Sequence, residues 1–155
     1  MKMRQLIARP RCRGVATVEF AIVAPVLLLL MLATAELGRL AYQYNTLTKA
    51  VRDGVRFAVN EAAVGSTRIV NITPLVRTQT LNLVVSGNVN GVGAPLLPGL
   101  SVENVSISND ANGFISVSAD YIYSPAFRGT LPTFGLGEPI NLNLSLTATV
   151  VMRAL

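Results

Sequence analysis

A 21-residue apolar run, from Val15 to Ala35, constrains the fold of this chain more than any other feature of its sequence. About 20 apolar residues in a helix are enough to cross the hydrocarbon core of a membrane. The segment before the run is basic and contains no acid, and basic flanks stay in the cytoplasm. The run therefore predicts one membrane-spanning helix with a cytoplasmic N-terminus. Its only charged side chain is Glu19, near its start.

The net charge of +5 is carried entirely by the segment before the apolar run. This position indicates that the charge determines how the helix is oriented in the membrane. From residue 15 onwards, the basic and acidic residues balance. We therefore expect the basic segment to orient the helix and do not expect a nucleic-acid partner. The basic residues of this segment are Lys2, Arg4, Arg9, Arg11 and Arg13.

The helical pattern does not stop at Ala35. Apolar or small residues recur at steps of three and four, from Leu37 to Ala62, which defines one face of a helix. The sequence predicts one helix from about Val15 to Val64, about 75 Å long, that ends at Gly65-Ser66 and can kink at Pro25. Its second half is amphipathic, with a polar face predicted to carry Arg39, Gln43, Lys49, Arg52, Asp53, Arg56 and Glu61.

The rest of the chain has the pattern of a small mixed domain. Thr73-Pro74 predicts the start of a helix that runs to about Val85, and a glycine- and proline-rich loop follows, from Ser86 to Ser101. Alternating apolar and polar residues then predict strands at Val102 to Ser108, Phe114 to Tyr123 and Ile140 to Met152. One face of this antiparallel sheet is expected to pack on the amphipathic part of the long helix. The fold class is therefore α+β.

The connection 124–139 is long, which is often a sign of function. It contains the apolar residues Phe127, Leu131, Phe134 and Leu136. We favour the interpretation that these side chains fold back onto the domain over the alternative that they bind a partner.

The start of the apolar run resembles a known processing site. Gly14 followed by Val15-Ala16-Thr17-Val18-Glu19-Phe20 resembles a prepilin cleavage site, and Phe20 after Glu19 fits the Flp branch of type IVb pilins. Residues 13–58 are similar to TadE-like proteins, the minor pseudopilins of the Tad (Flp-type) pilus system. The segments Pro25-Val26-Leu27-Leu28 and Glu36-Leu37-Gly38-Arg39 also resemble this family.

The resemblance implies a processing step and a role. A prepilin peptidase would cut between Gly14 and Val15, and Glu19 would pair with the new amine of its own chain or of a neighbouring subunit. The protein would be a pilin-like minor pseudopilin that supports Tad pilus assembly and adhesion. Its partners would be the inner membrane, the peptidase, other pilins and pseudopilins, and the Tad assembly machinery.

This interpretation divides the chain into four parts. Residues 1–14 are a basic leader, 15–35 the transmembrane half of the helix, 36–65 its amphipathic continuation, and 66–155 a periplasmic α+β head. The protein would be a single-pass inner-membrane protein that can also enter the extracellular pilus.

Two other interpretations stay open at this point. Ala33-Thr34-Ala35 has the form of a leader-peptidase site, so cleavage there would release a secreted binding domain. Without any cleavage, the chain would be a membrane-anchored periplasmic scaffold.

The sequence gives little sign of catalysis. It has no histidine, a single cysteine (Cys12), no glycine-rich phosphate loop after a strand and no cluster of metal-ligand residues. We therefore expect neither an enzyme nor a cofactor, a metal site or a small-molecule substrate.

Overall fold

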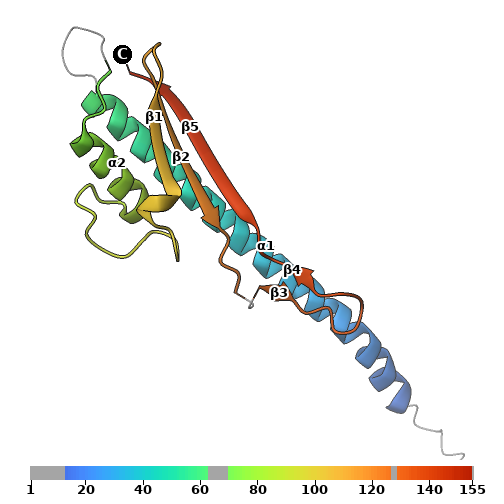
Figure 1. Ribbon diagram of the computed structural model, residues 1–155. Coiled ribbons are helices and arrows are strands. Elements are labelled where there is room, and N and C mark those ends of the chain that lie inside the picture. Colours follow the sequence, from blue (N-terminus) through green and yellow to red (C-terminus); the bar gives the residue numbers. More distant parts are fainter. Residues whose placement is uncertain (1–12, 63–69, 127–128, 155) are drawn as a thin grey trace, which may run out of the picture.

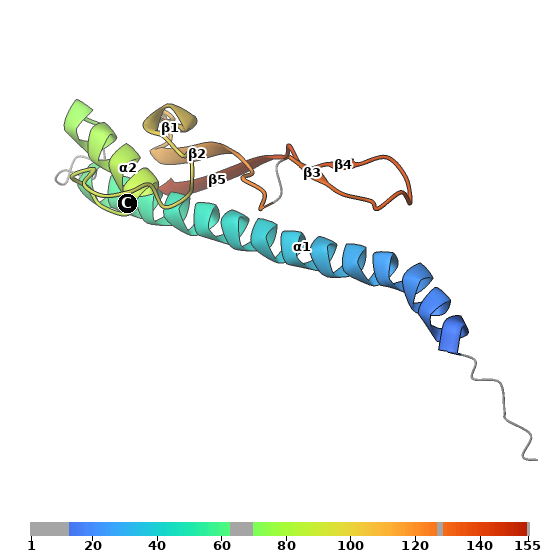
Figure 2. The same ribbon diagram turned by 90° about the horizontal axis from the view of Figure 1, so that it is seen from below.

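The long helix dominates the structure. The computed structural model describes residues 13–62, 70–126 and 129–154. Helix α1 runs without a break through Arg13–Ala62, 50 residues (Figure 1). The expectation of one long helix is therefore confirmed, while its expected end at Val64 and Gly65-Ser66 falls outside the described residues. Figure 2 shows the axis of α1 bending in its N-terminal part. Pro25, which removes one backbone donor from the helix, is in the N-terminal half of α1.

The second helix, α2, spans Pro74–Ser86, as the Thr73-Pro74 signal predicted. The Thr73 hydroxyl caps it by accepting a hydrogen bond from the Val76 N–H at 3.2 Å. Gly87 ends it in the left-handed region, at φ 71°, where glycine has no steric penalty.

Three strands form the main sheet. They are β1 (Val105–Asn109), β2 (Phe114–Ile122) and β5 (Ser145–Arg153), in the order β1-β2-β5, and both pairs are antiparallel. Asp110 closes the turn between β1 and β2, because its carboxylate accepts the N–H groups of Asn112 and Phe114.

The core lies between this sheet and the two helices. Figures 1 and 2 show α1 running along one face of the sheet, with α2 beside the C-terminal part of α1. The α+β fold class is confirmed. Only the second half of α1 contributes to the core, and its fully buried residues are Leu47, Val51, Val55, Ala58 and Ala62.

The strand predicted at Val102 to Ser108 was wrong at its start. Val102–Asn104 form a short 3-10 helix, η1, and β1 begins only at Val105. The Asn104 side chain accepts hydrogen bonds from the backbone N–H and the hydroxyl of Ser101. Such local side-chain bonds favour a turn over a strand.

The strand predicted from Ile140 to Met152 was also wrong, because it is two strands, β4 (Ile140–Asn141) and β5. Asn141 Oδ1 accepts the Asn143 N–H at 2.8 Å, and the Leu144 N–H donates to the Leu142 carbonyl at 2.9 Å. These two tight turns interrupt the extended backbone.

The connection 124–139 contains a further strand, β3 (Thr130–Leu131), which pairs with β4 in an antiparallel hairpin. This β3–β4 hairpin (residues 130–141) runs alongside α1 in both ribbon views. Leu131 is buried, as the favoured interpretation expected, but Phe134 and Leu136 at its tip are exposed, so for them that interpretation was wrong. Phe127 lies outside the described residues.

Gly54 is required where α1 meets α2. A Cβ atom at this position would overlap the Cγ2 methyl of Val84, a fully buried and conformationally stiff side chain. Gly54→Ala should therefore lower the free energy of unfolding by about 1–3 kcal/mol, as overpacking does. Thermal unfolding of the full chain in detergent, followed by circular dichroism, measures this.

Gly38→Ala is the matched control, because a Cβ atom there has no neighbour within 4 Å. It should be neutral or stabilising by up to about 1 kcal/mol, since alanine is the better helix former. Equal melting temperatures for the two variants would contradict this account of the contact between the helices.

Candidate functional site

A buried carboxylate lies where the apolar run ends. Glu36 is only 5% exposed, although it directly follows Ala35 on α1. One oxygen of its carboxylate accepts a hydrogen bond from the Tyr123 hydroxyl. The other oxygen accepts a hydrogen bond from the Ala126 N–H at 2.9 Å. A buried charge is costly unless hydrogen bonds replace its water. The chain after β2 supplies these bonds, and so it fastens the domain to the helix at this point.

Two further residues of α1 hold the same segment. The Gln43 side chain makes two bonds with the Ser124 backbone, donating to its carbonyl at 2.8 Å and accepting its N–H at 3.1 Å. The Arg39 Nε–H donates to the same carbonyl at 2.9 Å. We call this set the Glu36 network, and it comprises Glu36, Arg39, Gln43, Tyr123, Ser124 and Ala126.

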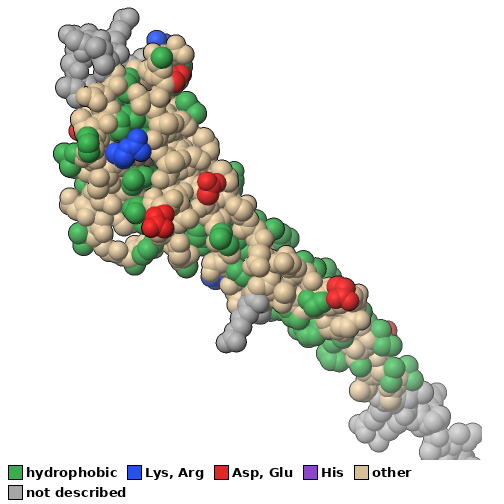
Figure 3. All heavy atoms as spheres, in the orientation of Figure 1, with side chains coloured by type: hydrophobic (Ala, Val, Ile, Leu, Met, Phe, Trp, Pro, Cys, Tyr) green, Lys and Arg blue, Asp and Glu red, His purple; other side chains and the backbone are tan. Residues whose placement is uncertain are grey.

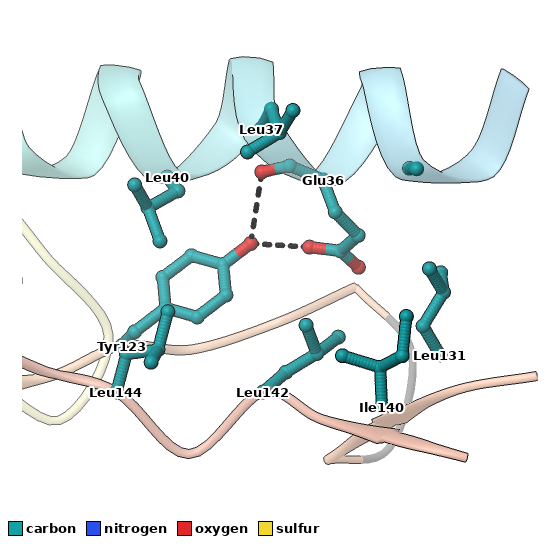
Figure 4. Close-up of a pocket in the computed structure, with 9 residues that line it drawn as sticks. Glu36, Leu37, Leu40, Tyr123, Leu131, Ile140, Leu142 and Leu144 are labelled. Carbon is teal, nitrogen blue, oxygen red and sulfur yellow. Dashed lines mark hydrogen bonds between the residues drawn. The ribbon is translucent and has the colours of Figure 1, made fainter. Parts of the chain in front are cut away.

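The surroundings of the Glu36 network are apolar. Figure 4 shows the Glu36 carboxylate and the Tyr123 ring in a groove between α1 and the hairpin segment, among leucine and isoleucine side chains. The groove has a volume of about 200 Å³. An apolar environment strengthens the hydrogen bonds within it. The apolar residues that line it are Ala33, Leu37, Leu40, Leu131, Ile140, Leu142 and Leu144.

This environment keeps Tyr123 protonated. Burial is the main cause that raises the pKa of its hydroxyl from 10.0 to about 12. The hydrogen bond to Glu36 and the negative charge of that carboxylate raise the pKa further, while Arg39 lowers it. The neutral hydroxyl is thus held as a donor, which is the form that the Glu36 carboxylate needs.

The predicted processing residues lie elsewhere on the molecule. Gly14, Val15 and Glu19 are in the first turns of α1 and are all exposed. Val15 and Glu19 are four residues apart and therefore on the same face of the helix, beside a shallow depression that Val18 and Ile22 also line. At 1.5 Å per residue, Glu19 is about 25 Å along the axis from Glu36, so the structure forms two separate groups.

The remaining family-like positions divide between these regions. Phe20 is 68% exposed on the apolar half of α1, and Pro25 lies within the same half. Gly38 faces open space. Arg39 joins the Glu36 network, so the Glu36-Leu37-Gly38-Arg39 segment supplies two of its members.

Sequence reasoning singled out only Glu36 and Arg39 among the six residues of this network. Gln43 was placed on the polar, exposed face, but it is only 3% exposed, so that assignment was wrong. Tyr123 and Ser124 were not singled out at all. The alternation along β2 showed that Tyr123 points to the covered face, but nothing local indicated a partner 87 residues away.

This arrangement of groups is suited to attaching the domain to the helix. Among the described residues, no group of three or more histidine, cysteine or acidic side chains is placed to hold a metal ion. The charged and polar groups of the Glu36 network bond to backbone and to one another. They hold the domain against the helix at the edge of the apolar run.

The first half of α1 has the length and composition to cross a membrane, and its most apolar window is not buried against the domain. The molecule is therefore of a recognisable class: an α+β domain carried on a long N-terminal helix that suggests a membrane anchor.

A comparison with models of protein families gives a match within the long helix. Residues 14–56 match the family model described as TadE-like protein, so this part of the chain is TadE-like, and the resemblance seen in the sequence is confirmed. The match suggests a protein associated with the Tad pilus, and the TadE-like family is in general non-enzymatic. Neither the curated proteins nor the solved structures contain a match to the chain.

Removing the Glu36 carboxylate should loosen the domain from the helix. Glu36→Ala leaves the Tyr123 hydroxyl and the Ala126 N–H without this acceptor, which costs about 1–3 kcal/mol of stability. Thermal unfolding of the full chain in detergent measures the loss. Glu103→Ala is the control, because Glu103 is exposed, and such surface changes usually stay within about 0.5 kcal/mol. Equal stability of the two variants would contradict the role of Glu36.

The raised pKa of Tyr123 predicts a loss of stability in strong alkali. Because the folded-state pKa (about 12) is above the ordinary value (10.0), its contribution is full below pH 10.0 and disappears as the pH rises towards about 12. The loss is about 1–3 kcal/mol. The melting temperature should therefore fall more steeply over this range in the wild type than in Tyr123→Phe, which lacks the ionisable group. Parallel pH profiles would refute the assignment.

Proposed function

We propose that this protein is a minor pseudopilin of the Tad pilus system, anchored in the bacterial inner membrane with its α+β head in the periplasm. A prepilin peptidase removes residues 1–14, and the mature subunit supports pilus assembly and adhesion through the exposed first half of α1. The observation that carries this proposal is the TadE-like match, which begins at Gly14, the residue before the proposed cut.

The position of Glu19 supports processing at this glycine. Cleavage after Gly14 creates an α-amine on Val15, with an ordinary pKa near 8, so it is mostly cationic at neutral pH. A charge at the membrane boundary is costly unless it has a partner. Glu19 is one helical turn further along, on the same face, and a carboxylate is also favourable near a helix N-terminus. It pairs with the amine of its own chain or, during assembly, with that of a neighbouring subunit.

The surface of the first half of α1 supports assembly through helix packing. Its large apolar side chains are not covered by the rest of the described chain, as Phe20 (68% exposed) and Ile22 (69%) illustrate. Figure 3 shows hydrophobic side chains along this narrow part of the molecule. Small residues such as Ala16, Ala21 and Ala24 let neighbouring helices approach closely. The head favours a minor subunit, because the resemblance implies that major pilins of this branch are little more than the helix.

The continuity of α1 argues against the secreted alternative. Cleavage after Ala35 would cut the helix directly before Glu36, which is tied to Tyr123 and Ala126. The new amine would lie beside the attachment point of the head. The uncleaved scaffold shares the observed architecture with the pseudopilin, and only the position of the mature N-terminus separates them.

N-terminal sequencing and intact mass of the protein, purified from membranes with and without a co-expressed prepilin peptidase, test the processing step. We expect a peptidase-dependent N-terminus at Val15. An N-terminus at Glu36 would support the secreted domain, and an intact Met1 in both preparations would support the scaffold. Either of these results contradicts the proposal.

Glu19→Ala tests the assembly step separately. We expect normal cleavage and membrane insertion, but at least about tenfold less protein co-purifying with other pilins, a loss of about 1.4 kcal/mol or more. Glu103→Ala removes an exposed carboxylate of the head and should leave co-purification unchanged. Normal co-assembly of the Glu19→Ala variant would refute the role of this residue.

A further inference from the structure

We infer that the tip of the β3–β4 hairpin, residues 132–139, is a second membrane-binding element, seated in the interface of the periplasmic leaflet beside α1. This inference rests on the insertion of α1 in the membrane, which is part of the proposed function, but on neither its cleavage nor its assembly. Four observations carry it: the position of the hairpin along the helix, the side chains at its tip, their backbone conformation and the distribution of charge.

The hairpin overlaps the membrane-spanning part of α1. Figures 1 and 2 both show it alongside the N-terminal half of the helix, beyond the main sheet. On that half, Leu28 (48% exposed) and Leu30 (56%) are exposed. Ala33 of α1 lines the groove together with Leu131 and Ile140 of the hairpin. The hairpin therefore reaches past the end of the apolar run, to a depth where α1 itself contacts lipid.

The depth of α1 makes this overlap unavoidable. With Glu19 at the cytoplasmic headgroups, the next 20 or so residues fill the hydrocarbon core, which places the opposite boundary between Ala35 and Arg39. Glu36 at this level is shielded by the Glu36 network. The hairpin residues Leu131 and Ile140, which line the groove with Ala33, are then at or just below the surface of the periplasmic leaflet.

The tip presents apolar side chains to that surface. Phe134 is 48% exposed and Leu136 is 60% exposed, with Ile140 (51%) on the adjoining strand. Phe134 has φ 54° and, among the described residues, is the only non-glycine with a positive φ. A bulky residue rarely adopts this conformation, and such strain is typical of sites where a contact requires it. Phenylalanine and leucine are among the side chains that interfacial elements bury at the boundary between headgroups and acyl chains.

Charge and hydrogen bonding fit shallow immersion. Glu138 is the only charged residue from Gly129 to Leu144, and its carboxylate limits the depth to the headgroup region. The tip satisfies part of its own backbone, because the Leu136 N–H donates to the Thr133 carbonyl at 3.0 Å and the Thr133 hydroxyl donates to the Gly137 carbonyl. Unpaired backbone groups are not tolerated deeper in the hydrocarbon.

Depth-dependent fluorescence quenching tests this inference on the full chain. Single cysteines replace Phe134 or Leu136 in a Cys12→Ser background and carry an environment-sensitive dye. The protein is reconstituted in vesicles of phosphatidylethanolamine and phosphatidylglycerol, with a lipid spin-labelled either near the headgroup or near the end of the acyl chain. Two reference positions are Leu28, on the exposed apolar face of α1, and Val92, 70% exposed in the head.

We expect dyes at both tip positions to shift to shorter wavelength and to be quenched most by the spin label near the headgroup. Leu28 should be quenched most by the deep label, and Val92 by neither. Water-like emission without quenching at both tip positions, with Leu28 quenched, would overturn the hairpin inference and leave the anchored pseudopilin intact. A dye at Leu28 that is not quenched would overturn the insertion of α1 and the inference with it.

A protein partner gives a different result. If the tip binds a second copy of the chain, the spectral shift disappears when labelled protein is diluted with vesicles, and quenching by lipid is absent. That outcome also overturns the inference. A shift and quenching that are independent of the protein-to-lipid ratio support contact with the bilayer.

Discussion

The packing of one face of α1 against the three-stranded sheet determines the arrangement of the whole molecule. Leu47, Val51 and Val55 are fully buried in the core that this packing forms with α2, so the second half of the helix is the centre of the core. Burial of such side chains contributes about 1.5–3 kcal/mol each. Because α1 has no break, fixing its second half also fixes the direction in which its uncovered apolar half extends.

The Glu36 network lies where these two halves meet. A buried ionised group adds little net stability, but it restricts the chain to arrangements that satisfy its hydrogen bonds. Here the partners are the backbone of Ser124 and Ala126 and the hydroxyl of Tyr123. We interpret the network as the element that sets the register of the head along α1. Under the proposed insertion of α1, this register would place the head against the membrane surface and the β3–β4 hairpin at the depth of the periplasmic leaflet.

Local patterns predicted those parts of the fold that local physics determines. The steps of three and four along α1, the Thr73-Pro74 start of α2 and the alternation of β2 each led to an element that the structure contains. The break before β5 was missed because Leu142 and Leu144 continue the alternation, while the turns at Asn141 and Leu144 depend on hydrogen bonds that the pattern does not show.

The residues of the candidate sites also differ in whether a local pattern of sequence marks them. Gly14 and Glu19 form a short motif, so the sequence and the resemblance could single them out as candidates. The burial of Gln43 could not be predicted in this way, because its partner Ser124 is 81 residues away. A polar residue on the expected exposed face gives no sign that a distant backbone segment will cover it. Only the three-dimensional fold brings these residues together.

The central claim is that one unbroken helix joins the membrane anchor to the core of the head. Amide hydrogen exchange on the full-length protein in lipid nanodiscs tests it most directly. The account predicts slow exchange that continues without a gap from the apolar run through Glu36 to Val55. Rapid exchange confined to the turns around Ala35 and Glu36 would contradict it, because it would reveal a break between anchor and head.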